Sequence, residues 1–344
     1  MPLTHRSILI IGGTGSLGKK LLERYLNADD VRIVHVYSRD ESKQWSLKND
    51  LANHPRAGRL QFWVGDIRDV DRLVEVMQIA HPNHVIVAAA LKQVDTCEAS
   101  PLESVKTNLL GTQNVISAVN RLLPANRPVK VLFISTDKAA SPVNTYGMCK
   151  AISERLITSQ NNPDVTYLCT RYGNVLESRG SIIPLFRYQA ENALFLTVTD
   201  PEMTRFAMNL EESVDLIEMA LERGRNGETW IPRLRSMRIG DLAEIFAEHY
   251  HKELKIVGHR PGEKLHEDLI NASESVRVRY QDDRYYAIAS ALKTPTGPSF
   301  TYTSASEVLT KVQLQDYLES LGIFTRDMSS FVGQSIEEIR TKGK

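Results

Sequence analysis

A carboxylic acid and an amine stand next to each other at Asp137 and Lys138, directly after the apolar run Lys130–Ile134. Residues that follow a buried strand lie at the edge of a sheet, where α/β proteins build their sites. Neighbouring titratable groups whose environments differ are a recurring acid/base arrangement. To act as a base, Lys138 must be neutral, and burial beside other cations is expected to depress its pKa. The alternative is an ordinary Asp-Lys ion pair on a loop.

A phenol and a second amine follow at Tyr146 and Lys150. Residues four apart share one face of a helix, so Lys150 is expected to lower the pKa of Tyr146 and to hold a cofactor ribose. A tyrosinate of this kind can take a hydroxyl proton while a hydride leaves the same carbon for a nicotinamide. An isolated Tyr-x-x-x-Lys is more often a packed tyrosine and a surface lysine. The position of this copy after a strand favours the catalytic interpretation.

Glycines follow the first apolar run of the chain at Gly12, Gly15 and Gly18. Glycine permits a tight turn and a close approach of backbone N–H groups to a pyrophosphate, whose charge is favoured at a helix N-terminus. An ordinary glycine turn is the alternative, and the preceding strand disfavours it. The cofactor contacts expected in this loop are Gly12, Thr14, Gly15, Ser16, Leu17 and Gly18.

The end of the second apolar run indicates which dinucleotide is bound. An acidic residue there would bind the ribose hydroxyls of NAD, whereas this run ends in Ser38 and Arg39. A guanidinium group can pair with a 2′-phosphate, so the sequence predicts NADP, with Ser38 and Lys43 assisting. The alternative is that Arg39 is a solvated loop charge. Further contacts are expected from Asp66, Ile67, Ala88, Ala89, Ala90, Lys92, Asn108 and Tyr172.

Strand-like and helix-like segments alternate along the first half of the chain. Strands are expected at 7–11, 32–37, 60–64, 84–88, 130–135 and 166–171, and helices after Gly15 and at 42–53, 70–80, 101–123 and 145–160. This rhythm predicts an α/β fold with a doubly wound parallel sheet of the Rossmann type. We expect a cofactor domain at 1–174, with a helix near 209–224 packing back on it, and a smaller mixed α/β substrate domain at 175–344.

Composition limits the partners. The 42 basic and 42 acidic residues cancel, which argues against nucleic acid or an anionic membrane as a partner and favours a small molecule. Three cysteines, Cys97, Cys149 and Cys169, fit neither a disulfide framework nor a cysteine-rich metal site, so no metal is expected. No apolar run approaches the ~20 residues that cross a bilayer. The expected protein is a cytoplasmic enzyme.

Taken together, the motifs resemble those of the inverting UDP-N-acetylglucosamine 4,6-dehydratases, which are extended short-chain dehydrogenases/reductases. The resemblance covers nearly the whole chain. Its N-terminal markers are Gly12-Gly13-Thr14-Gly15, Ser38-Arg39-Asp40-Glu41, Gly65-Asp66-Ile67-Arg68-Asp69 and Ala88-Ala89-Ala90-Leu91-Lys92. The later markers are Ser135-Thr136-Asp137-Lys138-Ala139, Arg171-Tyr172-Gly173-Asn174-Val175, Ser178-Arg179-Gly180-Ser181, Met203-Thr204-Arg205-Phe206 and Arg260-Pro261-Gly262-Glu263-Lys264-Leu265-His266-Glu267.

The resemblance implies three steps at one site: oxidation at C4 by NADP, elimination of the C6 hydroxyl, and return of the hydride to C6. It makes Lys138 the base at C5 and Asp137 the acid at the C6 oxygen, with Thr136 on the C4 oxygen. Reprotonation of C5 on its other face would give the L-arabino 4-keto-6-deoxy sugar. The resemblance also implies a homo-oligomer, a dimer or a hexamer.

Recognition of a UDP-sugar calls for guanidinium groups and backbone donors more than for a basic surface. By analogy with the family, Arg260 would meet the diphosphate, Glu263 a ribose hydroxyl, and Asn174 a phosphate or sugar oxygen. Arg205 and Lys92 complete the expected substrate contacts. The chain departs from the family at Val87 and Gln93, where histidines are usual, and at Ala207, where an aromatic residue is expected. These changes bear on the sugar pocket.

Two other functions fit parts of this pattern. A C4 epimerase, or a retaining 4,6-dehydratase acting on another nucleotide sugar, would use the same fold, but an epimerase has no task for an acid/base pair at C6. A non-catalytic NADP-binding regulator would need neither Tyr146 nor Lys150. The presence of both residues beside Asp137 argues against a regulator.

Overall fold

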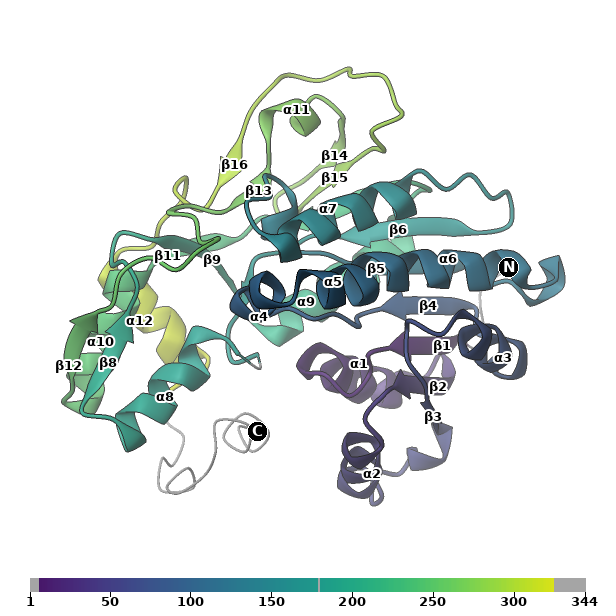
Figure 1. The fold of residues 1–344 in the computed structure, drawn as a ribbon, viewed down its shortest axis with the longest axis horizontal. Helices are drawn as coiled ribbons and strands as arrows, with labels where there is room; N and C mark the ends of the chain where they lie inside the picture. The colour runs from purple at the N-terminus through teal and green to yellow at the C-terminus, as the bar shows by residue number, and fades with distance from the viewer. Residues whose placement is uncertain (1–5, 179, 325–344) are drawn as a thin grey trace.

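In the computed structural model, which describes residues 6–178 and 180–324, one large twisted sheet runs through the centre of the protein (Figure 1). Its order is β14-β15-β10-β6-β5-β4-β1-β2-β3. The strands are β1 (Arg6–Ile11), β2 (Val31–Ser38), β3 (Leu60–Val64), β4 (His84–Val87), β5 (Lys130–Ile134), β6 (Thr166–Thr170), β10 (Thr229–Pro232), β14 (Val278–Gln281) and β15 (Tyr285–Ile288). Neighbours from β3 to β10 pair in parallel, whereas β15 and β14 pair antiparallel. The predicted α/β fold with a parallel sheet is therefore confirmed.

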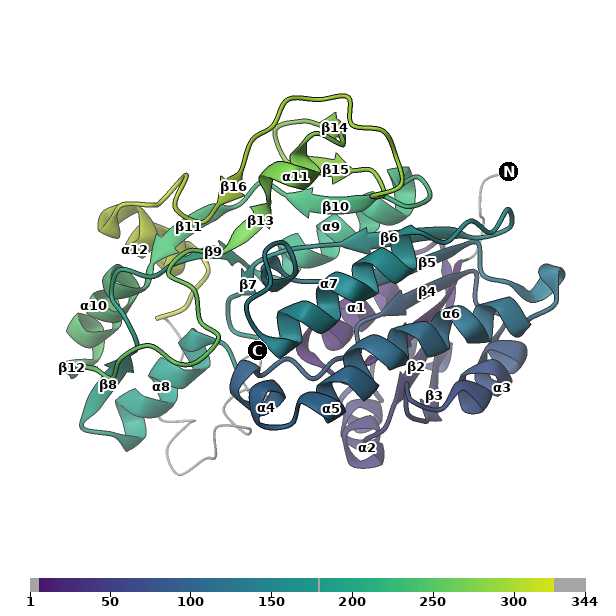
Figure 2. The ribbon, with the colours of Figure 1, turned by 45° about the horizontal axis from the view of Figure 1, so that its top comes forward.

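The sheet is apolar on both faces because its strands alternate between two cores. On β1, Ile8 and Ile10 face one core, and Leu9 and Ile11 face the other. Helices α1 (Ser16–Asn27) and α9 (Leu210–Arg223) contact each other on the first face. On the second face α3 (Val70–Ala80) contacts α6 (Gly111–Arg121), which contacts α7 (Thr145–Thr158). Figure 2 shows these two helical layers on either side of the strands.

The predicted helix at 101–123 is interrupted. It consists of α5 (Pro101–Ser104), a π-helical turn at Val105–Leu110, and α6. The turn contains Asn108, whose main-chain oxygen accepts hydrogen bonds from the hydroxyl groups of Thr112 and Ser153. Such turns often occur at functional sites. Here the side chain of Asn108 explains the interruption of the helix, because it fixes the loop after β4, as described below.

A smaller lobe lies to one side of the sheet (Figure 1). Its own core includes Ile183, Phe186, Leu242 and Phe246. The lobe consists of α8 (Ile182–Asn192), β8 (Phe195–Val198), α10 (Ile239–Tyr250), β12 (Glu253–Ile256) and α12 (Lys311–Ser320). Between the lobe and the large sheet lie two small sheets, made of β7 (Asn174–Val175), β9 (Thr204–Met208) and β11 (Arg235–Arg238), and of β13 (Asp268–Ile270) and β16 (Tyr302–Thr303).

The remaining helices are short: α2 (Glu41–Asp50), α4 (Val94–Ala99) and α11 (Ala272–Ser275). Strands β10, β14 and β15 come from the second half of the chain but belong to the large sheet. Within residues 6–178 and 180–324, no helix has both the length and the apolar character of a membrane span.

Candidate active site

The loop between β1 and α1 has the shape that a pyrophosphate needs. Gly12 has a φ of +94°, and a Cβ atom there would lie 2.5 Å from the nitrogen of Ala89. Glycine at this position therefore brings the end of β1 against the loop after β4. Helix α1 begins at Ser16, and its N-cap residue is Gly15, which has no side chain to cap the helix. Backbone N–H groups at such an end attract anions, so the loop fits the diphosphate of a dinucleotide.

The residues expected near the adenosine half lie at the ends of β2 and β3. Arg39 is half exposed, with Nη1 3.7 Å from Oδ2 of Asp66. Arg68 holds the same carboxylate from the other side, at 3.0 Å. Ser38 is buried and accepts a hydrogen bond from Gln44, while Lys43 pairs with Asp40 at 2.8 Å. The guanidinium group of Arg39 is thus exposed at the strand end where a 2′-phosphate would lie.

Three further expected cofactor contacts are engaged with the protein itself. The amide of Asn108 accepts a hydrogen bond from the nitrogen of Leu91 and donates one to its oxygen, both at 2.9 Å. It therefore holds the loop that carries Ala88–Ala90. The side chain of Ile67 is buried and packs where a Cβ on Gly111 would clash. Lys92 points to Ser178, with Nζ 3.4 Å from its hydroxyl oxygen.

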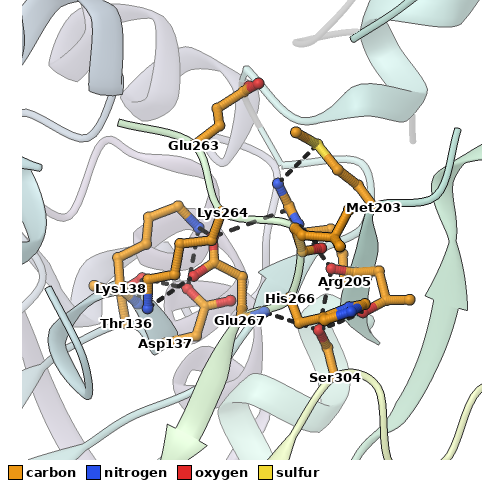
Figure 3. A network of polar contacts seen from close by, with 12 residues as sticks. Thr136, Asp137, Lys138, Met203, Arg205, Glu263, Lys264, His266, Glu267 and Ser304 are labelled. Atoms are coloured by element: carbon orange, nitrogen blue, oxygen red, sulfur yellow. Dashed lines mark hydrogen bonds and ion pairs between the residues drawn. The ribbon is translucent and has the colours of Figure 1, made fainter. Parts of the chain in front are cut away.

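Beyond the end of β5, the ammonium group of Lys138 lies between two carboxylates (Figure 3). Its Nζ atom is 3.1 Å from Oδ1 of Asp137 and 3.2 Å from Oε1 of Glu267. Both carboxylates are almost completely buried, at 1% and 3% side-chain exposure, whereas Lys138 is 20% exposed. The ammonium group of Lys138 is therefore partly accessible to a ligand, whereas the carboxylates of Asp137 and Glu267 contact it from its buried side.

The structure corrects one expectation for Lys138. Burial does favour the neutral amine, but Asp137 and Glu267 outweigh burial and raise the pKa of Lys138 above its ordinary value. Without a ligand, Lys138 is therefore an ammonium ion and not a neutral base. The expectation failed because it considered neighbouring cations, and the nearest charges are anionic.

Tyr146 lies within the same group. It is buried, which raises the pKa of its phenol, and the positive charge of Lys138 is the main influence that opposes this rise. A hydrogen bond with Thr136 acts in the same direction as Lys138. The hydroxyl group of Thr136 also donates to Oδ1 of Asp137 at 2.9 Å. The residues 136, 137, 138 and 146 thus form one interacting cluster.

Lys150 occupies the next turn of α7. Its Nζ donates a hydrogen bond to the oxygen of Ile134 at 2.7 Å and lies over the ring of Phe133. Burial lowers its pKa to about 8. Lys150 thus connects the main chain at the end of β5 to α7, the helix that also carries Tyr146. Lys150 was expected to lower the pKa of Tyr146, and this effect stays a prediction. The principal cation that acts on the phenol is Lys138.

Three of the expected substrate residues come from β9 and from the loop before β13. Arg205 is buried, and its Nη1 donates to the oxygens of Thr204 and Leu265 at 2.7 and 3.2 Å. Its Nε lies 4.0 Å from Glu267. Arg260 is exposed, and its backbone N–H donates to the carboxylate of Glu263 at 3.3 Å. Figure 3 shows Glu263 pointing away from the Lys138 cluster.

Several buried polar atoms near the cluster have no hydrogen-bond partner among the described residues. They include Oδ2 of Asp137, Oδ1 of Asn174 and Oε2 of Glu267. A Cβ on Gly173 would lie 2.5 Å from Cβ of Phe206 and 3.4 Å from that Asp137 oxygen, so only glycine permits this close approach of Phe206. Buried polar atoms normally find partners, so these three atoms are available to a ligand that enters the cluster. Tyr172 is buried behind this point, and its main-chain oxygen accepts from the nitrogen of Asp137 at 3.0 Å.

Long-range contacts bring the 260–271 segment to this cluster. Asn144 caps α7 through Gly147, and its amide nitrogen donates to the oxygen of Gly262, both at 2.8 Å. Asn271 likewise donates to the oxygen of Ala140. Glu267 reaches Lys138 through this arrangement. Glu267 belongs to one of the sequence motifs, but the sequence predicts no role for it, because no local pattern relates it to Lys138.

The departures from the family pattern lie in different surroundings. Val87 and Ala207 are buried in β4 and β9. Gln93 precedes α4 and faces Gly180, which has a φ of +78°. Gln93 therefore contacts a loop that borders the candidate site, where Lys92 and Ser178 also approach each other, and Ala207 pairs with Asn174 across β9 and β7.

Comparison with known proteins gives consistent matches. A family model described as "Polysaccharide biosynthesis protein" matches residues 8–289. A Rickettsia rickettsii protein named UDP-glucose 4-epimerase is 40% identical over 289 residues, which are 81% of this chain and 82% of that protein. The Rickettsia felis protein of the same name is 41% identical over 282 residues, 79% of this chain and 80% of the relative.

Solved structures show the same fold. The X-ray structure of Pen from Bacillus thuringiensis has a TM-score of 0.86 and 34% identity, covering 94% of this chain and 99% of Pen. DesIV from Streptomyces venezuelae, a dTDP-glucose 4,6-dehydratase with NAD and TYD bound, has a TM-score of 0.63 and 23% identity, covering 75% and 86%. At that identity the second match supports the fold alone.

Proposed function

Because the chain belongs to the polysaccharide biosynthesis protein family, whose model spans most of it, we propose that it is a nucleotide-sugar-modifying enzyme of the epimerase/dehydratase type. More specifically, we propose that it dehydrates UDP-N-acetylglucosamine at C4 and C6 with inversion at C5. The product is UDP-2-acetamido-2,6-dideoxy-β-L-arabino-hex-4-ulose. The observation that carries this proposal is the contact of Lys138 with Asp137 beside Tyr146 and Thr136.

The glycine loop and the exposed Arg39 support NADP as the cofactor, held by the β1–α1 turn and by the end of β2. When bound, NADP supplies reversible hydride transfer. Structures of related fold are described as complexes with NAD, among them the UDP-glucose 4-epimerase of Thermus thermophilus at 20% identity. The choice between the two dinucleotides is therefore a proposal that rests on Arg39.

In this proposal the residues of the chain handle protons. Tyr146 first gives its own proton to solvent, a loss that the positive charge of Lys138 favours, and as tyrosinate it then takes the proton of the C4 hydroxyl. Lys138 takes the C5 proton once it is neutral, and Asp137 gives a proton to the departing C6 oxygen. Transfer of one proton from Lys138 to Asp137 produces the required base and acid together: an N–H bond breaks, an O–H bond forms, and the net charge of the pair stays zero. Their 3.1 Å separation permits this exchange.

A C4 epimerase is the second candidate, and the printed name of the Rickettsia relatives favours it. Epimerisation needs only reversible oxidation at C4 and rotation of the ketone, so Lys138 and Asp137 would have no proton to move at C5 or C6. The two functions therefore make opposite predictions for the same variants.

Incubation with UDP-N-acetylglucosamine in deuterated water, followed by NMR, tests the proposal. Dehydration gives a 4-keto-6-deoxy sugar with deuterium at C5, whereas a C4 epimer without deuterium overturns it. The variants Lys138→Met and Asp137→Asn are expected to lose at least about 100-fold in dehydration, the usual contribution of a positioned acid or base. An epimerase would keep its turnover in both variants.

A further inference from the structure

Lys138 is held by a carboxylate that has no role in the function proposed above. Glu267 lies just before β13, far along the chain from Lys138, yet its Oε1 contacts the lysine Nζ at 3.2 Å. The side chain is 3% exposed, so it is almost completely buried. A buried carboxylate in contact with a proposed base influences when that base carries a proton.

The surrounding contacts fix Glu267 in this place. Its backbone N–H donates to the hydroxyl oxygen of Ser304 at 2.9 Å, and its carbonyl oxygen accepts from the nitrogen of Ser304 at 2.8 Å. That hydroxyl group also contacts Thr204, so β9 and the β13–β16 pair share one anchor. On the other side of the carboxylate, Lys264 lies 3.7 Å from Oε2 (Figure 3).

We propose that Glu267 is a positioning residue of the candidate site: it holds the Lys138 amine against Asp137 and decides the protonation state in which that amine meets a substrate. The inference deepens the proposed function and rests on it only in the assignment of Lys138 as the base at C5. The ion pair between Glu267 and Lys138 does not depend on which reaction the protein catalyses.

The charged and titratable groups that act on Lys138 or on its partner Glu267 come from several described elements. Asp137 precedes it in the chain, Tyr146 faces it from α7, Arg205 approaches from β9, and Lys264 and Glu267 come from the segment before β13. Asp137 and Glu267 stabilise the ammonium form, and Arg205 opposes them. If Glu267 becomes neutral, one of the two stabilising charges disappears. Lys138 then releases its proton, to Asp137 or to solvent, at a lower pH.

The direct test is NMR of the full chain labelled with ¹³C at lysine Cε and titrated from about pH 7 to about pH 11, a range that includes the ordinary lysine pKa of about 10.4. The Lys138 signal is identified by its loss in Lys138→Met. In the unchanged protein this signal is expected to stay at the ammonium position throughout. In Glu267→Gln it is expected to move to the amine position within the range, and a signal that stays in place overturns the proposal.

Asp268→Asn is the matched control. It removes the same charge one residue further on, where the carboxylate contacts Lys264 at 3.5 Å instead of Lys138. The Lys138 signal is expected to behave as in the unchanged protein. If the Lys138 signal of Asp268→Asn shifts as far as that of Glu267→Gln, any nearby carboxylate is enough to stabilise the ammonium form of Lys138. That result would contradict a specific role of Glu267. Should Glu267→Gln fail to fold, Glu267→Asp withdraws the carboxylate by one methylene group, and an unshifted signal there overturns the proposal equally.

The second readout is the pH dependence of kcat for dehydration. In the proposed mechanism the Lys138–Asp137 pair must hold one shared proton to supply the base and the acid together, so activity falls as the pH rises and the pair loses that proton. In Glu267→Gln this fall is expected at least about one pH unit lower, a typical effect of removing a neighbouring charge. A purely structural role would lower kcat equally at every pH and leave the pH of the fall unchanged. If no dehydration occurs at all, the proposed function fails, while the NMR titration still decides the role of Glu267.

Discussion

Arg171 and Glu154 form a buried ion pair in which Nη2 lies 2.5 Å from Oε2. The same guanidinium group pairs with Glu274 through Nη1 and donates to the oxygen of Leu269 at 2.8 Å. Glu154 belongs to α7, the helix of Tyr146 and Lys150, whereas Glu274 and Leu269 belong to the segment that continues from Glu267. Arg171 therefore joins the two parts of the candidate site.

Removal of Arg171 is expected to be costly. Arg171→Met leaves two buried carboxylates without their partner, and breaking a buried pair in this way costs about 3–5 kcal/mol. The free energy of unfolding in urea measures this loss. Arg24→Met is the matched control, because Arg24 also joins two elements through Glu211 and Asp215 but is 38% exposed. Exposed pairs contribute about 1 kcal/mol or less, so equal losses in the two variants would contradict the argument from burial.

The glycine loop gives a prediction for cofactor binding. In Gly12→Ala the new Cβ would lie 2.5 Å from the nitrogen of Ala89, at a φ that side chains rarely adopt. The loop must move, so dinucleotide affinity is expected to fall at least about tenfold, at a cost of about 1–3 kcal/mol in stability. Calorimetric titration with NADP measures the affinity. Gly58→Ala is the control, since nothing lies within 4 Å of its Cβ position. Unchanged affinity in Gly12→Ala would rule out this loop as the diphosphate site.

Arg39 provides the test of cofactor choice. A hydrogen bond to a charged group contributes about 1.5–3 kcal/mol, so Arg39→Ala is expected to weaken NADP binding about tenfold or more. Binding of NAD, which lacks the 2′-phosphate, should change much less. Arg72→Ala removes a comparable surface cation that pairs with Glu75, and it should affect neither dinucleotide. Equal losses for NADP and NAD in Arg39→Ala would refute the preference for NADP.

Lys150 makes folding stability depend on pH. Burial lowers its pKa from the ordinary 10.5 to about 8, so between these values the unfolded chain holds a proton that the folded chain has released. Stability therefore rises with pH in this window, by at most about 1.4 kcal/mol per unit, and the contribution is constant below about pH 8. Lys150→Met lacks this dependence. Urea unfolding of both ligand-free proteins at about pH 7.5 and about pH 9.5 should show the unchanged protein gaining up to about 2 kcal/mol relative to the variant. An equal pH response in both proteins would contradict the assigned shift.

The sequence alone indicated six of the nine strands of the large sheet and their alternation with helices, but not β10, β14 and β15. Six expected strands appear at 6–11, 31–38, 60–64, 84–87, 130–134 and 166–170, because strand and turn signals are local and each apolar run must be buried on both faces. The helix at 70–80 appears with the expected bounds. The C-terminal segment 316–344 is amphipathic and then charged in its sequence, and it lies mostly outside the described residues.

Tertiary structure decided the electrostatics of the candidate site. The adjacency of Asp137 and Lys138 is covalent and could be read from the sequence, but the contact of Lys138 with Glu267 depends on β13, on Ser304 and on the Arg171 cluster. The pKa of a lysine follows from all charges within a few ångströms, whatever their distance along the chain. For this reason the sequence could nominate Lys138 as a base, while only the folded chain shows the second carboxylate that keeps it protonated.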